Sequence, residues 1–287
     1  MLTKADMNMV QEIREIMQNG MMDEDPRPHY SDGSPAHTKF ITQTMYKYNL
    51  DRDEFPILTL RPIAWKGAIR EVLAIYQLAS NKLADVGHIW DNWAIGDGET
   101  IGPVYGETVR RYDLMGKLLN GIKNNPYGRR HMISLWQEPE LEEAKKVGAL
   151  MPCAFLTMFS VSGKYLDMTL IQRSGDSLTA SGPGGWNEVQ YAAFLMMVAR
   201  HTGYKPRNFV HFVQNEQIYD RHFDQAKELE RRYEKQCPRD FHNLNPEPKV
   251  RLILNPRAKN FYKMTVDDFT IENYNPIKPQ LKMDIGI

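Results

Sequence analysis

Two alternating runs of residues, 155–161 and 166–170, constrain the fold of this chain more than any other feature. In each run one face collects the apolar side chains at every second position, a period typical of half-buried β-strands. Ser162-Gly163-Lys164 between the runs is typical of a tight turn. The stretch therefore predicts an antiparallel hairpin, with Cys153 at the start of one strand and beside the end of its partner.

The open end of this hairpin carries polar residues of the kind found in binding sites. Cys153 follows a proline, and Arg173, Ser174 and Asp176 follow the second strand. A reactive thiolate needs nearby positive charge to lower its pKa, and Arg173 can supply that charge. Two other interpretations of Cys153 are a core thiol and the nucleophile of a Cys-His hydrolase. None of the eight histidines can be placed opposite the cysteine, which disfavours the hydrolase.

The composition disfavours several classes of partner. Lys and Arg number 36, as do Asp and Glu, so bulk charge calls for neither DNA nor a membrane surface. No apolar run approaches the roughly 20 residues of a membrane span. Two cysteines and sixteen methionines suit a reducing compartment, and we expect a soluble cytoplasmic protein. No repeat or linker divides the chain, so residues 1–287 are expected to form one domain.

Several motifs together resemble a known family. Met-Pro-Cys at 151–153, Gln-Arg-Ser-x-Asp at 172–176 and an asparagine four residues before Tyr191 are similar to the nucleotide-binding centre of the thymidylate synthases. The segments AIREVLAIYQLASN, HIWDNW, TIGPVYG and NNPYGRRHMISLW, and the tail MDIGI, resemble that family in the same order. The resemblance implies an α/β (α+β) fold. In it, helices cover one face of a mixed, twisted sheet, and the other face forms a homodimer.

The resemblance also implies the reaction. We expect reductive methylation of dUMP by 5,10-methylenetetrahydrofolate, which yields dTMP and dihydrofolate. Addition of the Cys153 thiolate to pyrimidine C6 would turn the unreactive C5 into an enolate carbon that attacks the one-carbon unit. The implied partners are dUMP, the folate and a second copy of the chain, and no metal is implied.

The resemblance assigns individual residues to three groups, by their positions within the matching motifs. The catalytic group comprises Cys153, Glu71, Arg173, Asn187 and Tyr105. The nucleotide-binding group comprises Arg27, Arg129, Arg130, Arg173, Ser174, Asp176, Asn187, Gln217 and Tyr219. The folate-binding group comprises Trp90, Trp93, Asp176 and Ile287. Each residue also has an ordinary structural interpretation, such as core packing for the two tryptophans.

Local patterns refine some of these roles. Glu71 is expected near the first turn of a helix that is apolar on nearly all sides, where burial would raise its pKa toward neutrality. Arg129 and Arg130 are expected to enter a strand and so to face opposite ways. The resemblance implies that this pair reaches the other subunit's phosphate. Asn187 offers both a donor and an acceptor to the O4/N3 edge of uracil.

The remaining segments predict helices, strands and loops around the site. An amphipathic helix over 4–19 is expected to end at Gly20, and a Pro- and Asp-rich loop follows it. A short strand is expected to begin at Phe55, just before the helix that carries Glu71. A fully buried helix should follow Asn187, and a strand should then lead to Tyr219.

Three departures from the family pattern keep other functions open. The loop LTASGPGGWN lengthens the connection from Asp176 to Asn187, Gln217 stands in place of a family histidine, and Ala154 stands where many members carry histidine. These changes leave a dUMP or dCMP hydroxymethylase as the alternative, because such an enzyme quenches the same intermediate with water. A non-catalytic nucleotide or RNA binder is disfavoured because the catalytic residues are retained together. Cys237, in a charged, turn-rich stretch, has no expected role.

Overall fold

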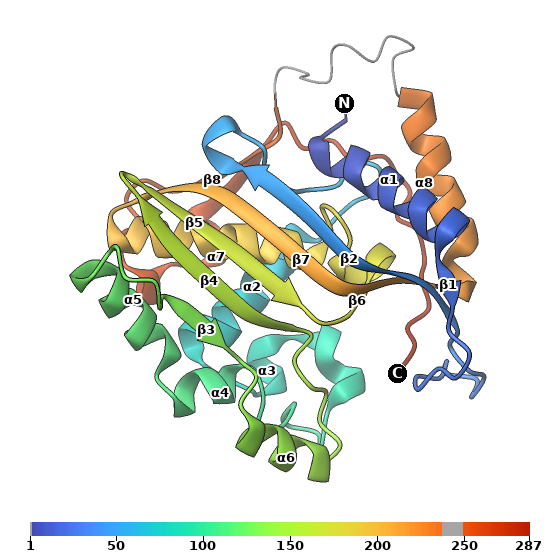
Figure 1. Ribbon diagram of the computed structural model, residues 1–287, viewed down its shortest axis with the longest axis horizontal. Helices are drawn as coiled ribbons and strands as arrows, with labels where there is room; N and C mark the ends of the chain where they lie inside the picture. Colours follow the sequence, from blue (N-terminus) through green and yellow to red (C-terminus); the bar gives the residue numbers. More distant parts are fainter. Residues whose placement is uncertain (1, 237–248) are drawn as a thin grey trace.

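A computed structural model describes residues 2–236 and 249–287, so Cys237 lies outside the described residues. Its centre is a mixed sheet in the order β1-β2-β7-β5-β4-β3, with the short β6 paired to β7 (Figure 1). The strands are β1 Met21–Met22, β2 Thr38–Asn49, β3 Met132–Ser134, β4 Ala154–Ser162, β5 Tyr165–Gln172, β6 Gly175–Asp176 and β7 Lys205–Tyr219. Both β5 and β6 pair with β7 in parallel, and the other neighbours are antiparallel. The predicted mixed sheet is confirmed.

The predicted hairpin is formed by β4 and β5. Ser162 pairs with Tyr165, and Gly163 turns the chain with a φ of 58°, in the left-handed region that suits glycine. A register shift between Ala154 and Leu156 breaks the expected alternation at Phe155. Beyond the shift, Leu166, Met168 and Leu170 of β5 are all buried. The hairpin therefore faces the core as predicted and carries Cys153 at its open end.

Helices pack behind this sheet in the view of Figure 1. The central one, α7 (Trp186–Thr202), is buried along most of its length and packs against α2 (Trp65–Val72). The other helices are α1 Lys4–Asn19, α3 Leu83–Val86, α4 Gly106–Arg111, α5 Leu114–Asn124, α6 Glu138–Lys146 and α8 Phe223–Gln236. Among the described residues no helix crosses the sheet face turned toward the viewer in Figure 1, so helices cover one face as expected. A separate pair of strands, β8 Arg251–Leu254 and β9 Phe269–Glu272, completes the fold.

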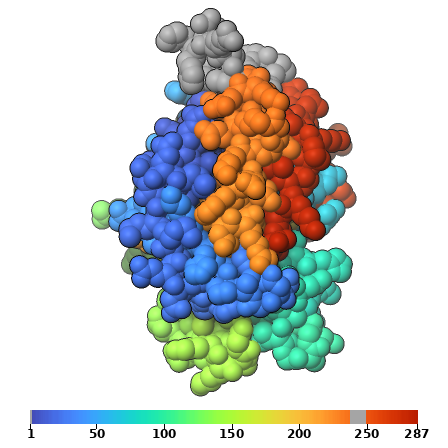
Figure 2. Space-filling model, turned by 90° about the vertical axis from the view of Figure 1, so that its right-hand side faces the viewer, coloured from blue at the N-terminus to red at the C-terminus, as the bar shows by residue number. Residues whose placement is uncertain are grey.

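The N-terminal helix α1 follows its prediction closely. Thr3 caps it through a reciprocal pair of hydrogen bonds with Asp6, and it ends at Gly20. Its apolar face joins the main core, a single cluster of contacting side chains whose members range in sequence from Leu2 to Phe269. Figure 2 shows α8 on the surface between this N-terminal part and the C-terminal segment. In the described part of the chain, no helix is long and apolar enough to span a bilayer.

Three sequence-based placements are wrong. No strand begins at Phe55. The backbone there is irregular because Thr59 and Leu60 donate to the Asp6 carboxylate instead of to a neighbouring strand. Glu71 is the seventh residue of the eight-residue α2, not a first-turn residue, and the helix continues as a π-helix, Leu73–Leu78. Arg129 and Arg130 do not enter a strand, since β3 begins only at Met132.

Candidate active site

One cavity of about 980 Å³ gathers almost every residue that the sequence assigned to a site. Its size suits a bound nucleotide together with a second organic ligand. The predicted residues that line it are Arg27, Glu71, Trp90, Trp93, Tyr105, Cys153, Arg173, Ser174, Asp176, Asn187, Gln217, Tyr219 and Ile287. Arg129 and Arg130 are the two predicted residues that do not. The sheet supplies one wall, α2 and α7 supply another, and the loop around Arg27 meets the C-terminal tail at the edge.

Backbone hydrogen bonds hold Cys153 at the open end of the β4–β5 hairpin. Its N–H donates to the Tyr105 hydroxyl at 3.2 Å, and its carbonyl accepts from the Arg173 N–H at 3.0 Å. Burial raises the pKa of the thiol, while the positive charges of Arg173 and Arg27 lower it. The expected influence of Arg173 on the thiol pKa is present, but burial outweighs it. The thiolate form therefore depends on the cations around it.

Arg173 is fixed above the cysteine loop. Its Nε donates to the Pro152 carbonyl and its Nη2 to the Met151 carbonyl, each at 3.0 Å. Its guanidinium also lies 6.0 Å from the centre of the Trp136 ring. A planar, permanently charged group held in this way is suited to bind an anion next to the thiol.

Glu71 is a buried carboxyl between two indoles. It accepts hydrogen bonds from Trp90 Nε1 at 2.7 Å and from Trp186 Nε1. Burial raises its pKa to about 7, although hydrogen bonds from Trp186, Trp90 and Gln190 oppose the rise. The predicted direction is confirmed, and a carboxyl with this pKa can exchange protons near neutral pH. Trp90 in turn packs edge-on against Trp93 and Tyr105, which ties the aromatic wall to the acid.

Asn187 lies in the first turn of α7 and remains in the pocket despite the lengthened loop before it. Its Oδ1 accepts from Gln172 Nε2 and its Nδ2 donates to Gln190 Oε1, each at 3.3 Å. The loop is compact because Gly184 has a φ of 69° and approaches Leu58 so closely that a Cβ would lie 2.6 Å from the Leu58 nitrogen. Asn187 therefore lines the cavity at the end of a closely packed loop.

Asp176 stands at the start of the same loop. It accepts a hydrogen bond from the Thr179 hydroxyl, and one of its oxygens is buried without a partner. Burial raises the pKa of Asp176, and the nearby His222 opposes this rise. An unsatisfied buried carboxylate oxygen that lines a pocket is a ready acceptor for a ligand N–H.

The C-terminal tail closes one side of the cavity. Ile287 and His29 exchange two backbone hydrogen bonds of 2.9 Å, which join the tail to the loop that carries Arg27. The buried ring of His222 contacts the Asp284 carbonyl through Nε2 at 2.7 Å. Both ends of the chain thus contribute to the site, as the sequence predicted for Arg27 and Ile287.

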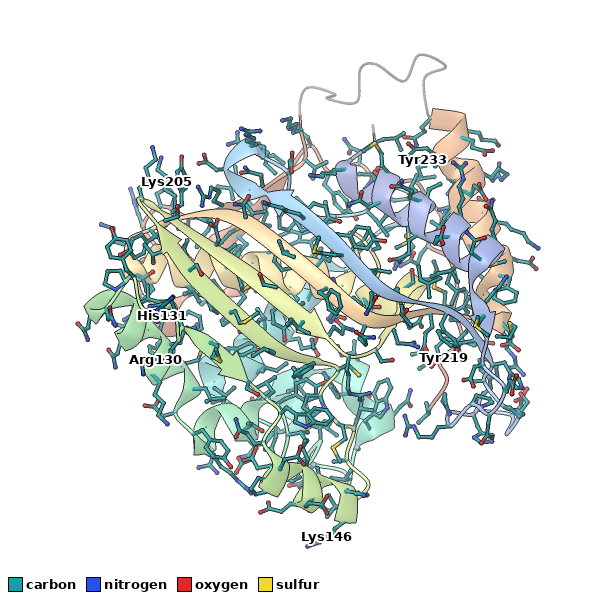
Figure 3. The ribbon with its side chains drawn as sticks, in the orientation of Figure 1. Arg130, His131, Lys146, Lys205, Tyr219 and Tyr233 are labelled. Atoms are coloured by element: carbon teal, nitrogen blue, oxygen red, sulfur yellow. The ribbon has the colours of Figure 1, made fainter. Side chains whose placement is uncertain are left out.

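Arg129 and Arg130 are exposed and lie in the bend before β3. Figure 3 shows Arg130 on the opposite side of the view from Tyr219, which lines the cavity. His131 next to them is anchored by a 2.9 Å contact between its Nε2 and the Asn125 carbonyl, which fixes the bend. Within one chain these arginines do not reach the site.

Sequence reasoning missed several residues that shape the pocket. Gln172 and Gln190 hold Asn187, Trp186 holds Glu71, and Trp136 lies under Arg173. The first three adjoin predicted site residues in the sequence or follow them by one helical turn, and that proximity was the available signal. Trp136 is the last residue of the segment NNPYGRRHMISLW, and its place in that segment was the available signal. Among residues 2–236 and 249–287, no group of His, Cys, Asp or Glu could hold a metal ion.

Comparisons with known proteins agree with this geometry. The family model described as thymidylate synthase matches residues 8–287. The thymidylate synthases of Streptococcus gordonii and Streptococcus sanguinis are 43% and 44% identical to the chain over 296 aligned residues, and each comparison covers both proteins completely. The solved structure of thermostable thymidylate synthase A from Bacillus subtilis superposes with a TM-score of 0.85 at 32% identity and covers 99% of both chains. These findings confirm the predicted fold and activity: the chain belongs to the thymidylate synthase family.

Proposed function

We propose that this cavity methylates dUMP with 5,10-methylenetetrahydrofolate, yielding dTMP and dihydrofolate, with Cys153 as the nucleophile. The observation that carries the proposal is the meeting of a half-buried thiol, a buried carboxyl of raised pKa and a fixed amide in one cavity. When bound, the folate supplies both the carbon and the hydride.

Each catalytic group has a distinct part in the reaction. Cys153 adds to C6 of the pyrimidine, and the resulting enolate attacks the one-carbon unit from C5. Arg173 stabilises the thiolate and contacts the substrate phosphate. Glu71, with its pKa of about 7, moves protons around the ring. The Tyr105 hydroxyl keeps the Cys153 backbone in place at 3.2 Å.

Recognition is divided among the walls of the cavity. Arg27, Arg173 and Ser174 bind the phosphate, whose negative charge suits a guanidinium fork. Gln217 and Tyr219 lie two residues apart on β7, so they face the same side and can contact the sugar. Asn187 reads the base. The folate rests on Trp90, Trp93 and Ile287, with Asp176 as acceptor for its pterin.

An assay of both products tests this function. Dihydrofolate formation is followed by absorbance while the nucleotide product is identified by mass, and we expect dihydrofolate and dTMP in equal amounts. Tetrahydrofolate together with a hydroxymethyl nucleotide from dUMP or dCMP would instead establish a hydroxymethylase. Binding of dUMP without any product would indicate a non-catalytic nucleotide binder.

Asn187→Asp is expected to shift the preference from dUMP toward dCMP. An acceptor placed opposite uracil O4 is left without a partner, whereas the amino group of cytosine gains one. One unsatisfied buried pair costs roughly 1 to 3 kcal/mol, or about ten- to a hundredfold in relative kcat/KM. The measurement is kcat/KM for both nucleotides with wild type and variant. An unchanged ratio would mean that another residue reads the base.

We further propose that the chain is a homodimer, joined through the sheet face that the helices leave open, and that Arg129 and Arg130 bind the phosphate in the partner's cavity. Their exposure, and their position away from their own cavity, support this arrangement. Residues 1–287 would then form one catalytic domain per subunit, since a single main core joins α1 to β9. A cytoplasmic location fits the free Cys153 thiol.

Mixed dimers test the exchange of arginines. A chain carrying Arg129→Ala and Arg130→Ala is co-expressed with a Cys153→Ala chain, each being inactive as a homodimer. In the mixed dimer one cavity has an intact cysteine and intact arginines from its partner. Random pairing should therefore restore about a quarter of wild-type activity. The matched control pairs Glu71→Gln with Cys153→Ala, which lie in the same cavity and should give no recovery. Equal failure of both pairs, with dimers verified by light scattering, would contradict the exchange.

A further inference from the structure

We propose that Glu188 and His211, which do not line the cavity, are positioning residues that set the orientation of the Asn187 amide and thereby the preference for uracil over cytosine. Both side chains are fully buried, with 0% exposure. They act through Gln172, which lines the cavity between them and Asn187. This inference rests on the proposed function, because it takes Asn187 as the residue that reads the base.

A continuous line of polar contacts joins these residues. Glu188 Oε1 lies 3.4 Å from His211 Nδ1, and His211 Nε2 lies 3.1 Å from Gln172 Oε1. Gln172 Nε2 then donates to Asn187 Oδ1 at 3.3 Å. The line starts on α7, crosses β7 and β5, and returns to the first turn of α7. Three packed elements therefore hold the amide that lines the cavity.

The donors and acceptors along this line permit only one arrangement. The Ser174 carbonyl oxygen can only accept a hydrogen bond, and it lies 3.0 Å from Gln172 Nε2. The nitrogen of the Gln172 side chain must therefore point toward Ser174. Gln172 Oε1 therefore faces His211, which must present an N–H from its Nε2. Gln172 Nε2 also donates to Asn187, so Asn187 must turn its side-chain oxygen toward Gln172.

Glu188 holds the imidazole in the position that this arrangement needs. Its Oε2 accepts the Gly184 N–H at 2.6 Å, so the carboxylate is anchored by the lengthened loop itself. Its other oxygen faces His211 Nδ1, and the ring is stacked on Phe209 with a 14° angle between the planes. Because a carboxylate oxygen faces Nδ1 and the Gln172 oxygen faces Nε2, both ring nitrogens must carry a hydrogen, so the ring is a donor on both sides. The loop, the carboxylate and the ring thus form one support.

The orientation of the Asn187 amide decides which base it fits. Its oxygen has two lone pairs and its nitrogen two hydrogens. Gln172 occupies one lone pair and Gln190 one hydrogen, which leaves one acceptor and one donor for the base. In this orientation they match the N3–H and O4 of uracil. Rotated by half a turn, the same amide would match the N4 amino group and N3 of cytosine, so the support selects uracil.

The test measures kcat/KM for dUMP and for dCMP in His211→Phe, which keeps the flat ring but removes both nitrogens. We expect the dUMP-to-dCMP ratio to fall by about tenfold or more. His211→Gln, whose amide can still donate to Gln172, should recover most of the ratio. The matched control is Glu140→Gln, another buried glutamate, which pairs with Arg111 at 3.5 Å, away from this line. It should leave the ratio unchanged even if it lowers the melting temperature.

If His211→Phe does not fold, Gln172→Glu supplies the same test, because a carboxylate cannot donate to Asn187 and should also lower the ratio about tenfold. An unchanged ratio in a folded His211→Phe or Gln172→Glu variant would overturn the inference. Failure of the proposed function would be seen separately, since the wild-type chain would then make no dTMP at all.

Discussion

Cys153→Ala is expected to abolish dTMP formation, lowering kcat by roughly five orders of magnitude, as loss of a covalent nucleophile does in other enzymes. Binding of dUMP should survive, because the side chains proposed to hold the phosphate and the base remain in place. The Cys153 backbone makes the contacts to Tyr105 and Arg173, so alanine should leave the pocket intact. The dihydrofolate assay measures the loss, and equilibrium dialysis with dUMP measures the retained binding.

The second cysteine provides the control for this prediction. Cys237→Ala changes the only other cysteine of the sequence, to which no role is assigned, and should keep kcat within about twofold. Substantial activity in Cys153→Ala would refute the covalent mechanism. If only Cys237→Ala lost activity, the nucleophile would be Cys237 and not Cys153.

Glu71→Gln should lower kcat by roughly 10²- to 10⁴-fold, the range typical of a lost general acid or base. The substitution keeps the size of the side chain but removes its ionisation. The wild-type pH–rate profile should show an ionisation near pH 7, and the variant profile should lack it. Asp85→Asn, an exposed carboxylate near the same helix, serves as the control and should leave the profile unchanged. An ionisation near pH 7 that persists in Glu71→Gln would belong to another group.

The same carboxyl affects stability in a direction that can be worked out. Burial raises its pKa from 4.5 to about 7, so the folded state binds the proton more tightly than the unfolded state. Glu71 therefore favours folding most below pH 4.5, and this advantage is lost as the pH rises to 7. The loss is about 3 kcal/mol for a shift of this size. Denaturant titrations across this window should show a weaker pH dependence in Glu71→Gln than in wild type.

Local patterns predicted the elements that have a clear period. The hairpin of β4 and β5 and the amphipathic α1 follow from apolar residues at spacings of two and of three to four, whereas the buried α7 follows from a run that is apolar on all sides. The segment from Phe55 did not follow, because a short apolar run cannot by itself distinguish a strand from irregular buried backbone. There the Asp6 side chain, from a helix far away in sequence, accepts the backbone hydrogen bonds.

The candidate site was predictable in its residues and less so in their environment. The motifs brought Cys153, Glu71 and Asn187 into one cavity, but the motifs did not show that burial would outweigh the arginines at the thiol. The support from Glu188 through His211 was also invisible. These residues come from two elements and carry no shared spacing, so only the folded arrangement brings them together. The resemblance to the family identified the reacting groups, and their burial in the folded chain determined the direction of their pKa shifts.

A fluorinated substrate analogue can trap the covalent complex between Cys153 and the pyrimidine. The chain is incubated with 5-fluoro-dUMP and 5,10-methylenetetrahydrofolate, digested, and mapped by mass spectrometry. Because fluorine at C5 cannot leave as a proton, the adduct should persist, and we expect one nucleotide and one folate on the peptide that contains Cys153. Absence of the adduct, or its appearance on Cys237 or another residue, would contradict the role of Cys153 as the nucleophile.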